Sequence, residues 1–318
     1  MKGKISLIIL TATILVACNP QSKKITPEEA KQIAKEAYLY GYPLVMNYKT
    51  LYAYTLDKNS PEYKGEFNVK SCDARVYTPE DKAIVTPNSD TPYCIFWSDI
   101  SHEPVVVSVP EMEADRYYSF QFVDLFSHNF AYVGTIVTGN EAGKYIIAPT
   151  DWTGAKPDGI TDIIYCESDL FLTIVRTQLM DENDLDKVQS IQDAYQIQLL
   201  SEYLGEESNY MAPSIEWPQW NEGDQFTEAS FKYVDIVLSL TQEIESEKTL
   251  RQQFAKLNIG TAEPYNFESF DEDIQEAIKT GVKEGFAEME AFLKKNATDP
   301  LSSTKMFGTR TFLNQSAK

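Results

Sequence analysis

The segment between residues 82 and 180 constrains the fold more than any other part of the chain. It consists of short runs in which apolar and polar residues alternate: IVTPN, YCIFWSDI, PVVVSVP, RYYSFQFVDLF, NFAYVGTIVTGN, GKYIIAP, TDIIYCE and DLFLTIVRTQL. Alternation with a period of two is typical of β-strands, and Gly139-Asn140 and Asp158-Gly159 supply turn signals. Several short strands at close spacing predict an antiparallel β-sandwich or a jelly-roll-like barrel over residues 82–180. The pattern leaves open whether its interior is lined by Tyr118, Phe120, Phe122 and Asp124 or by their alternates.

A helical pattern precedes this segment, over residues 26–81. It begins with Thr26-Pro27-Glu28-Glu29, which offers an N-cap threonine, a proline at the first helical position and a glutamate at the third, the features of a capping box. Apolar and aromatic residues then recur at steps of three and four, so one face of the helix is expected to pack inward. Pro43 lies inside this pattern and is expected to kink or split the helix.

Residues 181–300 return to a helical pattern. The helical stretches read DENDLDKVQSIQDAYQIQLL, TEASFKYVDIVLSLTQEI and DEDIQEAIKTGVKEGFAEMEAFLKK, and an aromatic loop, SIEWPQWNEG, separates the first two. No internal repeat or low-complexity linker divides the chain. The sequence therefore predicts a single α+β unit in which helices from both ends cover the β-sandwich, with a short tail at residues 301–318.

The N-terminus has the features of a secretory signal. A basic start is followed by the apolar stretch ISLIILTATILVA, which is too short to span a bilayer comfortably. Its end, Leu15-Val16-Ala17-Cys18, is similar to the bacterial lipobox, in which the cysteine is lipidated and becomes the first residue of the mature protein. We therefore expect a signal peptide at 1–17, lipidation of Cys18, a polar tether at 18–25 and a protein anchored in the bacterial cell envelope, at the outer membrane on its periplasmic or surface side.

The acidic composition limits the partners. The formal net charge is -20 at pH 7, and the acid is spread through stretches such as DENDLD and ESFDEDIQE, which is typical of solvated helical faces. Nucleic acid needs a basic footprint that the sequence lacks, so no nucleic-acid partner is expected. The expected partners are the membrane, through the lipid on Cys18, and a small-molecule or glycan ligand.

Three cysteines follow Cys18, at Cys72, Cys94 and Cys166. In an oxidising compartment this odd number allows one disulfide and one free thiol. Cys94 and Cys166 lie inside apolar strand-like runs, which favours at least one of them as a small buried hydrophobic residue. No CxxC pair and no Cys/His spacing of a metal site appears, so no metal is expected.

The sequence carries no familiar catalytic motif. It has no GxSxG elbow, Walker loop, GxGxxG or HExxH, and its two histidines, His102 and His128, are more typical of surface or structural positions than of ligands or bases. No cofactor is expected, and no catalytic residue is assigned. What remain are charged residues in or beside the predicted strands: Asp90, Asp99, Asp124, Arg116 and Arg176. Charges in a β core are costly unless paired, so each belongs either to a structural ion pair or to a site.

The turn PNSDTPY, residues 87–93, concentrates polar side chains between two prolines. Asn88 and Asp90 can hydrogen-bond backbone groups two residues on, so a rigid Asx-turn accounts for every residue. A stiff loop that presents Asn88, Asp90 and Thr91 near Tyr93 is also a favourable place to hold polar ligand groups, because rigidity lowers the entropic cost of binding. Both interpretations stay open at this point.

The same turn belongs to a longer resemblance. PNSDTPY is preceded by YLYGYPLVMNY and followed in order by WSDI, EPVVVSVP, RYYSFQFVDLF, VGT and TG, and this series resembles the bacterial family called domain of unknown function 1254. The resemblance implies the family's fold and a site but no reaction, because the family's activity is not established. Carried over by position, the motif residues are Asn88, Asp90, Thr91, Tyr93, Asp99, Arg116, Tyr117, Asp124 and Arg176, with Gly41, Tyr42 and Pro43 in the first helix.

The resemblance also concerns the end of the chain. Family members commonly continue into a second β domain, domain of unknown function 1214, after a segment like Phe307-Gly308-Thr309-Arg310, and this sequence ends eight residues later. The resemblance therefore implies either a naturally short form or a truncated product. In the second case, a site shared between the two domains is incomplete.

Three functions are compatible with these observations. The first is a lipid-anchored envelope protein that binds a small or glycan-like ligand on the sandwich, with the candidates Asn88, Asp90, Thr91, Tyr93, Arg116, Tyr117, Asp124 and Arg176. The second is a hydrolase or lyase that acts on an envelope or dietary polymer, which requires Asp90, Asp124, Arg116 and a tyrosine in one pocket. The third is a structural partner in an envelope complex, with the WPQW loop and the C-terminal end as its contact.

Overall fold

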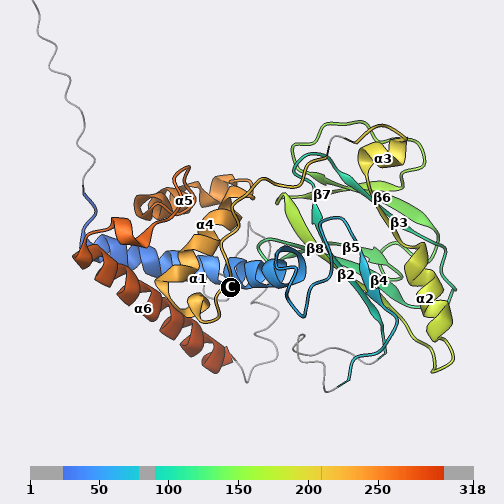
Figure 1. The fold of residues 1–318 in the computed structure, drawn as a ribbon, viewed down its shortest axis with the longest axis horizontal. Helices are drawn as coiled ribbons and strands as arrows, with labels where there is room; N and C mark the ends of the chain where they lie inside the picture. The colour runs from blue at the N-terminus through green and yellow to red at the C-terminus, as the bar shows by residue number, and fades with distance from the viewer. Residues whose placement is uncertain (1–23, 79–89, 209, 297–318) are drawn as a thin grey trace, which may run out of the picture.

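The protein is an α+β molecule in which two packed sheets lie beside a group of helices (Figure 1). The computed structural model describes residues 24–78, 90–208 and 210–296. Cys18, the predicted signal peptide, the IVTPN run and the C-terminal tail lie outside the described residues. The remaining predicted strands are confirmed, because each alternating run from YCIFWSDI to DLFLTIVRTQL contains one strand.

Nine strands form two open sheets in the part of the chain that the structure describes. The five-stranded sheet has the order β1-β2-β8-β4-β5 and is antiparallel throughout. Its strands are β1 (Ser71–Asp73), β2 (Tyr93–Asp99), β4 (Tyr118–Asp124), β5 (Asn129–Gly134) and β8 (Leu170–Thr177). The four-stranded sheet has the order β7-β6-β3-β9, with β3 (Val105–Val109), β6 (Gly143–Pro149), β7 (Asp162–Cys166) and β9 (Gln196–Leu199). The β6–β7 pair is parallel, so the second sheet is mixed, and the described strands do not close into the alternative barrel.

The structure settles which side chains of the five-stranded sheet face the interior. Tyr118, Phe120 and Phe122 of β4 are fully buried between the two sheets, where they pack with Cys94 and Phe96 of β2. The alternate residues point to the opposite, outer face. On that face Ile95, Trp97, Val123 and Leu172 belong to a second core, which they share with the helices.

The helices from the two ends of the chain contact each other, and their core includes apolar side chains of this outer face. They are α1 (Pro27–Leu51), α4 (Phe231–Ser239), α5 (Lys248–Phe254) and α6 (Glu272–Asn296), with short 3-10 turns at Asp224–Phe226, Glu228–Ser230, Glu245–Glu247, Ala255–Leu257 and Phe267–Ser269. Helix α6 runs along α1 so closely that a Cβ atom at Gly281 would lie 2.2 Å from the carbonyl oxygen of Lys31. None of the helices in the described residues is both long and apolar enough to cross a membrane.

Helix α1 confirms the predicted capping box but not a split at its proline. The Thr26 side chain accepts a hydrogen bond from the Glu29 amide, and the Glu29 side chain accepts one from the Thr26 amide. The helix continues through Pro43 to Leu51 and then passes into a turn of π-helix, Tyr52–Leu56. Packing of this helix against α4, α5 and α6 offsets the backbone hydrogen bond that the proline removes.

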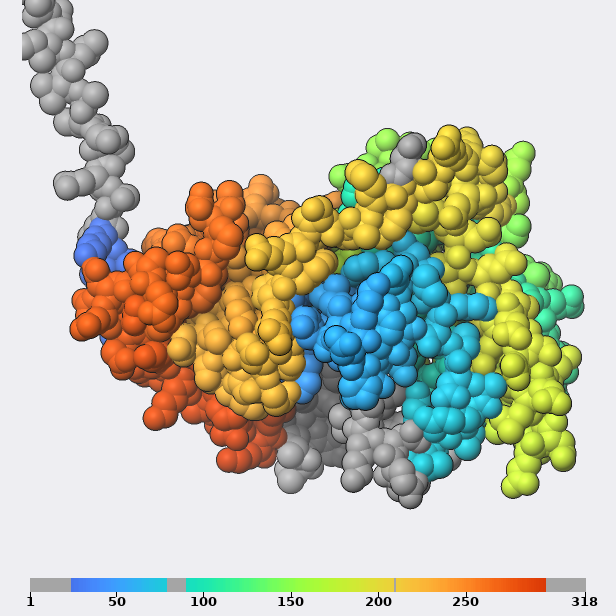
Figure 2. Space-filling view, in the orientation of Figure 1, coloured from blue at the N-terminus to red at the C-terminus, as the bar shows by residue number. Residues whose placement is uncertain are grey.

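Part of the C-terminal helical prediction was wrong. Helix α2 (Leu185–Ala194) ends before QIQL, which forms strand β9 and pairs with β3; helix α3 (Leu200–Leu204) then follows. Pairing with the edge of a sheet and burial of Leu199 in the core between the sheets outweigh the helical pattern of this stretch. Beyond α3 the chain crosses from the sheets to the helices over the surface (Figure 2).

The cysteines divide into one disulfide and one buried thiol. Cys72 is bonded to Cys94, which ties the edge strand β1 to β2, while Cys166 is buried and free. Burial raises the pKa of the Cys166 thiol to about 12, so this side chain remains a neutral apolar group. Cys166 confirms the expectation that at least one of Cys94 and Cys166 is a small buried hydrophobic residue, and the described cysteines form the allowed pattern of one disulfide and one free thiol.

Candidate functional site

One end of the outer face of the five-stranded sheet carries polar and aromatic side chains instead of helix-covered apolar ones. The strand register places Tyr93, Arg176, Ser119 and Gly134 in one row across β2, β8, β4 and β5. The next row toward the helices contains Gln121 opposite Tyr132. We call Tyr93, Tyr117, Ser119, Gln121, Tyr132 and Arg176 the Arg176 patch.

Arg176 is partly exposed, and the described contacts that hold its side chain in place involve no carboxylate. Its Nη1 donates to Oε1 of Gln121 at 2.7 Å, and its guanidinium carbon lies 5.2 Å from the ring centroid of Tyr93. Gln121 in turn donates from Nε2 to Oδ1 of Asn129 at 2.7 Å. Among the described residues, no carboxylate forms an ion pair with Arg176. An amide and an aromatic ring fix its plane, and most of its donors have no protein acceptor there.

A groove of about 230 Å³ adjoins this arginine. It is lined by Tyr117, Tyr118, Ser119, Tyr132, Val133, Gly134, Ile136 and Val137. Ser119 belongs both to the groove and to the row of Arg176, its partner across the β4–β8 pair. Apolar walls with a few polar groups at one end are typical of sites for small molecules.

The shape of the groove depends on Gly134, at the end of β5. A Cβ atom at this position would lie 2.4 Å from the carbonyl oxygen of Tyr118, so a side chain here requires the strands to separate. The Gly134 carbonyl accepts from the amides of Val137 and Thr138 at 3.0 and 2.8 Å. This tight turn leaves Ile136 85% and Val137 63% exposed beside the groove.

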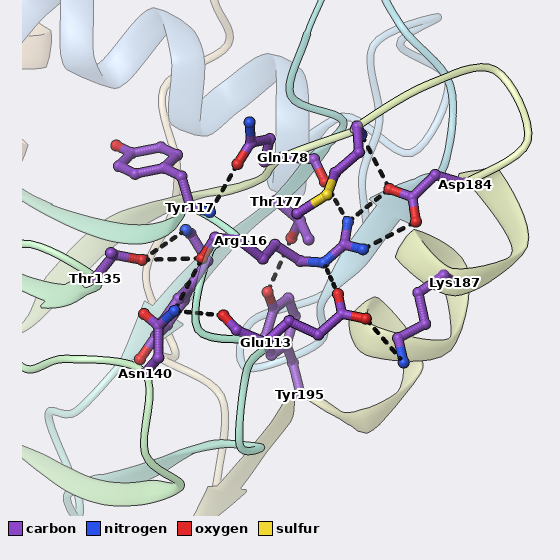
Figure 3. Close-up of polar contacts among 12 residues, drawn as sticks. Glu113, Arg116, Tyr117, Thr135, Asn140, Thr177, Gln178, Asp184, Lys187 and Tyr195 are labelled. Carbon is purple, nitrogen blue, oxygen red and sulfur yellow. Dashed lines mark hydrogen bonds and ion pairs between the residues drawn. The ribbon is translucent and has the colours of Figure 1, made fainter.

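Arg116 lies in a different environment, although it belongs to the same predicted set (Figure 3). Only 2% of its side chain is exposed, and its Nη1 and Nη2 donate to both carboxylate oxygens of Asp184 at 2.6 and 2.8 Å. Its Nε donates to Glu113 at 2.5 Å, and Nη1 also donates to the Gln178 carbonyl at 2.7 Å. The hydrogen bond from Arg116 holds the pKa of the Asp184 carboxyl below its usual value. Arg116 therefore closes a structural ion pair, while the ring of the adjacent Tyr117 points away from it.

The predicted carboxylates at Asp124 and Asp99 are also occupied by structural contacts. Asp124 is buried at the end of β4, and its Oδ1 accepts from the amides of Phe126 and His128 at 2.8 and 2.9 Å. Its carbonyl accepts from Asn47 of α1, which joins this turn to the helices. Asp99 is fully buried and accepts a hydrogen bond from the Tyr210 hydroxyl at 2.8 Å.

The turn before β2 is described only in part. Asn88 lies outside the described residues. The side chain of Asp90 is exposed, and its carbonyl accepts from the Leu179 amide at 2.9 Å, while Thr91 is buried. Tyr93 is 5% exposed and contacts Tyr77 at 5.2 Å between ring centroids. The turn thus leads directly into the Arg176 patch through Tyr93.

The helical part of the motif has a packing role. A Cβ atom at Gly41 would lie 2.5 Å from Cγ2 of Val234, so the missing side chain lets α1 approach α4. Tyr42 is half-buried against the same core, and the Pro43 carbonyl faces the Ser127 hydroxyl at 3.4 Å. These residues position the sheet relative to the helices.

The structure does not assemble the constellation that the hydrolase or lyase hypothesis required. Arg116 precedes β4 and Asp124 ends it, and a strand of this length separates its ends by about 20 Å.

The WPQW loop was expected to form an exposed contact surface, but its tryptophans are half-buried. The ring centroid of Trp217 lies 6.4 Å from that of Tyr48, and the ring centroid of Trp220 lies 4.9 Å from that of Tyr233. These two rings therefore pack against the helical core instead of facing a partner.

Sequence reasoning missed Ser119, Gln121 and Tyr132 as members of the site. A signal for the first two was present, since they are the polar residues that alternate with Tyr118, Phe120 and Phe122. Knowing which face is open requires the position of the helices. Tyr132 carries no such signal, because an exposed tyrosine on an edge strand is common.

The range of residues 67–199 matches the family model described as "Protein of unknown function (DUF1254)". It holds all the strands from β1 to β9, including every residue of the Arg176 patch. A comparison with curated proteins finds no match.

Among solved structures, the chain is similar to the VPA0106 protein from Vibrio parahaemolyticus. The TM-score is 0.71 with 23% sequence identity, over 91% of this chain and 65% of that one, so the chain spans about two thirds of its length. A putative uncharacterized protein from Burkholderia cenocepacia matches with a TM-score of 0.29 and 12% identity, over 58% of this chain and 49% of that one. The first similarity supports the fold.

Proposed function

We propose that this protein is a lipid-anchored component of the bacterial cell envelope that binds a small, glycan-like ligand on the Arg176 patch. The observation that carries the proposal is Arg176 itself, a partly exposed arginine with no carboxylate partner among the described residues, beside a groove lined by tyrosines. The envelope location rests on the lipobox-like sequence that ends at Cys18.

The chemistry of the patch suits a ligand with both polar and apolar faces. Tyr117 and Tyr132 offer rings that can pack against the C–H face of a sugar and hydroxyls that remain wet, since tyrosine combines an apolar body with a polar tip. The Gln121 amide and the Arg176 guanidinium supply directional polar groups at the side of the groove. Both lie on paired strands, which hold a site more rigidly than a loop does.

The proposal is tested by measuring the binding of a panel of mono- and oligosaccharides to the full mature protein. Saturation-transfer NMR, which detects weak binding, is expected to identify at least one binder. Tyr132→Ala, which removes one wall of the groove, is expected to weaken that binding at least about tenfold, as loss of a stacking ring costs on the order of 1–3 kcal/mol at a binding site.

Tyr165 provides the matched control, because it is a similarly exposed tyrosine on a strand of the other sheet: 48% exposed against 39% for Tyr132. Tyr165→Ala is expected to leave binding unchanged. Equal losses in the two variants, or no binder in the whole panel, contradict the proposed function.

A further inference from the structure

We infer that the ligand of the Arg176 patch is a carboxylate-bearing sugar whose acid group pairs with Arg176 while its ring lies in the groove. The inference rests on the proposed function and narrows it from glycan-like ligands to uronic-acid-type ones. It follows from the state of the guanidinium, from the distribution of acids around the arginines, and from the distance between Arg176 and the groove.

The guanidinium of Arg176 retains the geometry that recognises a carboxylate. An arginine has five N–H donors in a planar fork, and the bond to Gln121 uses one of them. Tyr93 lies under the guanidinium and Gln121 beside it, so the plane is fixed before a ligand arrives. A planar, weakly hydrated cation held in one orientation suits a bidentate carboxylate better than a neutral hydroxyl group.

The other described arginines are each paired with a carboxylate of the protein itself. Arg75, Arg116 and Arg251 form ion pairs with Asp73, Asp184 and Glu247. The protein has a net charge of -20, so carboxylates are abundant. None of the carboxylates in the described residues forms an ion pair with Arg176. A half-buried cation that lacks an internal anion is stabilised when an anion comes from outside.

The distance between Arg176 and the groove fits one sugar ring. Ser119 is the direct cross-strand partner of Arg176 and also lines the groove, and neighbouring strands lie about 4.8 Å apart. A carboxylate attached to a six-membered ring can therefore reach Arg176 while the ring lies over Ser119 and against Tyr132. A substituent on the far side of the ring meets the exposed apolar side chains of Ile136 and Val137.

The experiment compares two probes that differ only in the acid group: phenyl β-D-glucuronide and phenyl β-D-glucoside. Titration of the full mature protein, followed by NMR or calorimetry, is expected to show tighter binding of the glucuronide by about fivefold, the effect of one partly exposed ion pair. Arg176→Gln is expected to abolish this preference, so that the variant binds the glucuronide and the glucoside with equal affinity. Arg176→Lys keeps the charge without the planar fork, so it retains part of the preference.

Lys156→Gln is the matched charge control, because it removes one exposed cation beside the four-stranded sheet, away from the patch. It is expected to keep the full preference for the glucuronide. If it loses the preference as Arg176→Gln does, the effect comes from net charge and the inference is overturned.

The outcomes separate the inference from the proposed function. Equal affinity of the wild type for the two probes, with both lost in Tyr132→Ala, overturns the carboxylate inference and supports the glycan site. Binding of neither probe also overturns the inference, while the proposed function is decided by the wider glycan panel. Thermal denaturation of each variant confirms that a loss of binding is not a loss of folding.

Discussion

Arg116 lies just before strand β4 and Arg176 lies on the neighbouring strand β8, yet their chemical environments are opposite. Arg116 is buried, and two carboxylates and a carbonyl accept its hydrogen bonds (Figure 3). Arg176 is partly exposed and is held by an amide and a tyrosine ring. Both belong to the motif residues that the family resemblance implies, so the motif alone does not tell them apart. The number of protein acceptors around each guanidinium separates a structural charge from a ligand-facing one.

The difference comes from what covers each end of the sheet. Arg116 lies under the start of α2, where Asp184 is the N-cap residue and accepts from both terminal nitrogens of the guanidinium. Arg176 lies on the outer face, beyond the apolar side chains that pack against α1 and α4. The first arginine joins a helix to the sheet, and the second faces the side of the molecule that the helices leave open.

The largest predicted effect concerns Arg116, the buried arginine of the comparison. Arg116→Gln is expected to lower the free energy of unfolding by about 2–4 kcal/mol, because it leaves Asp184 and Glu113 close together without their shared cation. Urea denaturation at pH 7.5 measures the loss. A change below about 0.5 kcal/mol, the range of ordinary surface substitutions, contradicts a structural role for Arg116.

The pH dependence of stability gives this prediction a control. Arg116 lowers the folded-state pKa of Asp184, so the pair stabilises the fold above the unfolded pKa of the carboxyl, and this contribution is lost as the pH falls through the folded value. In Arg116→Gln the loss of stability between neutral and acidic pH is expected to be smaller than in the wild type. Equal pH profiles for the two proteins contradict the ion pair.

The strands were predictable because alternation is a local property, whereas the choice of the exposed face is not. The run RYYSFQFVDLF fixed a strand, but its register with β8 and the position of α1 decide that Phe120 faces inward and Gln121 outward. Strand β9 was missed because its pairing with β3 is a long-range contact that the pattern of QIQL does not contain.

The site was predictable to a similar degree. Tyr93, Tyr117 and Arg176 were among the candidates, and the structure brings them to one face. Asp124 was a candidate for the same reason, a charge at the end of a strand, but its carboxylate accepts backbone amides of its own turn. Sequence identifies charges that need a partner, and only the fold shows whether the protein supplies that partner.

Asp169 extends the comparison to the opposite sign of charge, because no cation among the described residues forms an ion pair with this carboxylate. Asp169 lies between β7 and β8, and burial together with the nearby Asp99 and Asp151 raises its pKa to about 6. Its folded pKa is above the ordinary aspartate value of 3.8, so the charged form destabilises the fold, with no effect below about pH 4 and the full effect above about pH 6. Asp169→Asn is expected to raise stability by about 1–2 kcal/mol at pH 7.5, a value reduced for solvent screening.

Urea denaturation of the wild type and of Asp169→Asn at pH 4 and pH 7.5 tests this expectation. The two proteins are expected to be nearly equal in stability at pH 4, where the wild-type carboxyl is protonated, and to diverge at pH 7.5. A variant that is less stable than the wild type at pH 7.5 shows that the charge of Asp169 has a favourable partner.

The smallest predicted effect concerns Arg176, the partly exposed arginine of the comparison. Arg176→Gln is expected to change the free energy of unfolding by less than about 1 kcal/mol, because the side chain is partly exposed and contributes one hydrogen bond and one contact with Tyr93. The same urea experiment that detects the large loss in Arg116→Gln measures it. A loss as large as that of Arg116→Gln makes Arg176 a structural residue and removes the contrast between the two arginines. A small change in the free energy of unfolding, combined with loss of the preference for the glucuronide, shows that Arg176 acts in ligand binding, because the substitution then weakens binding without destabilising the fold.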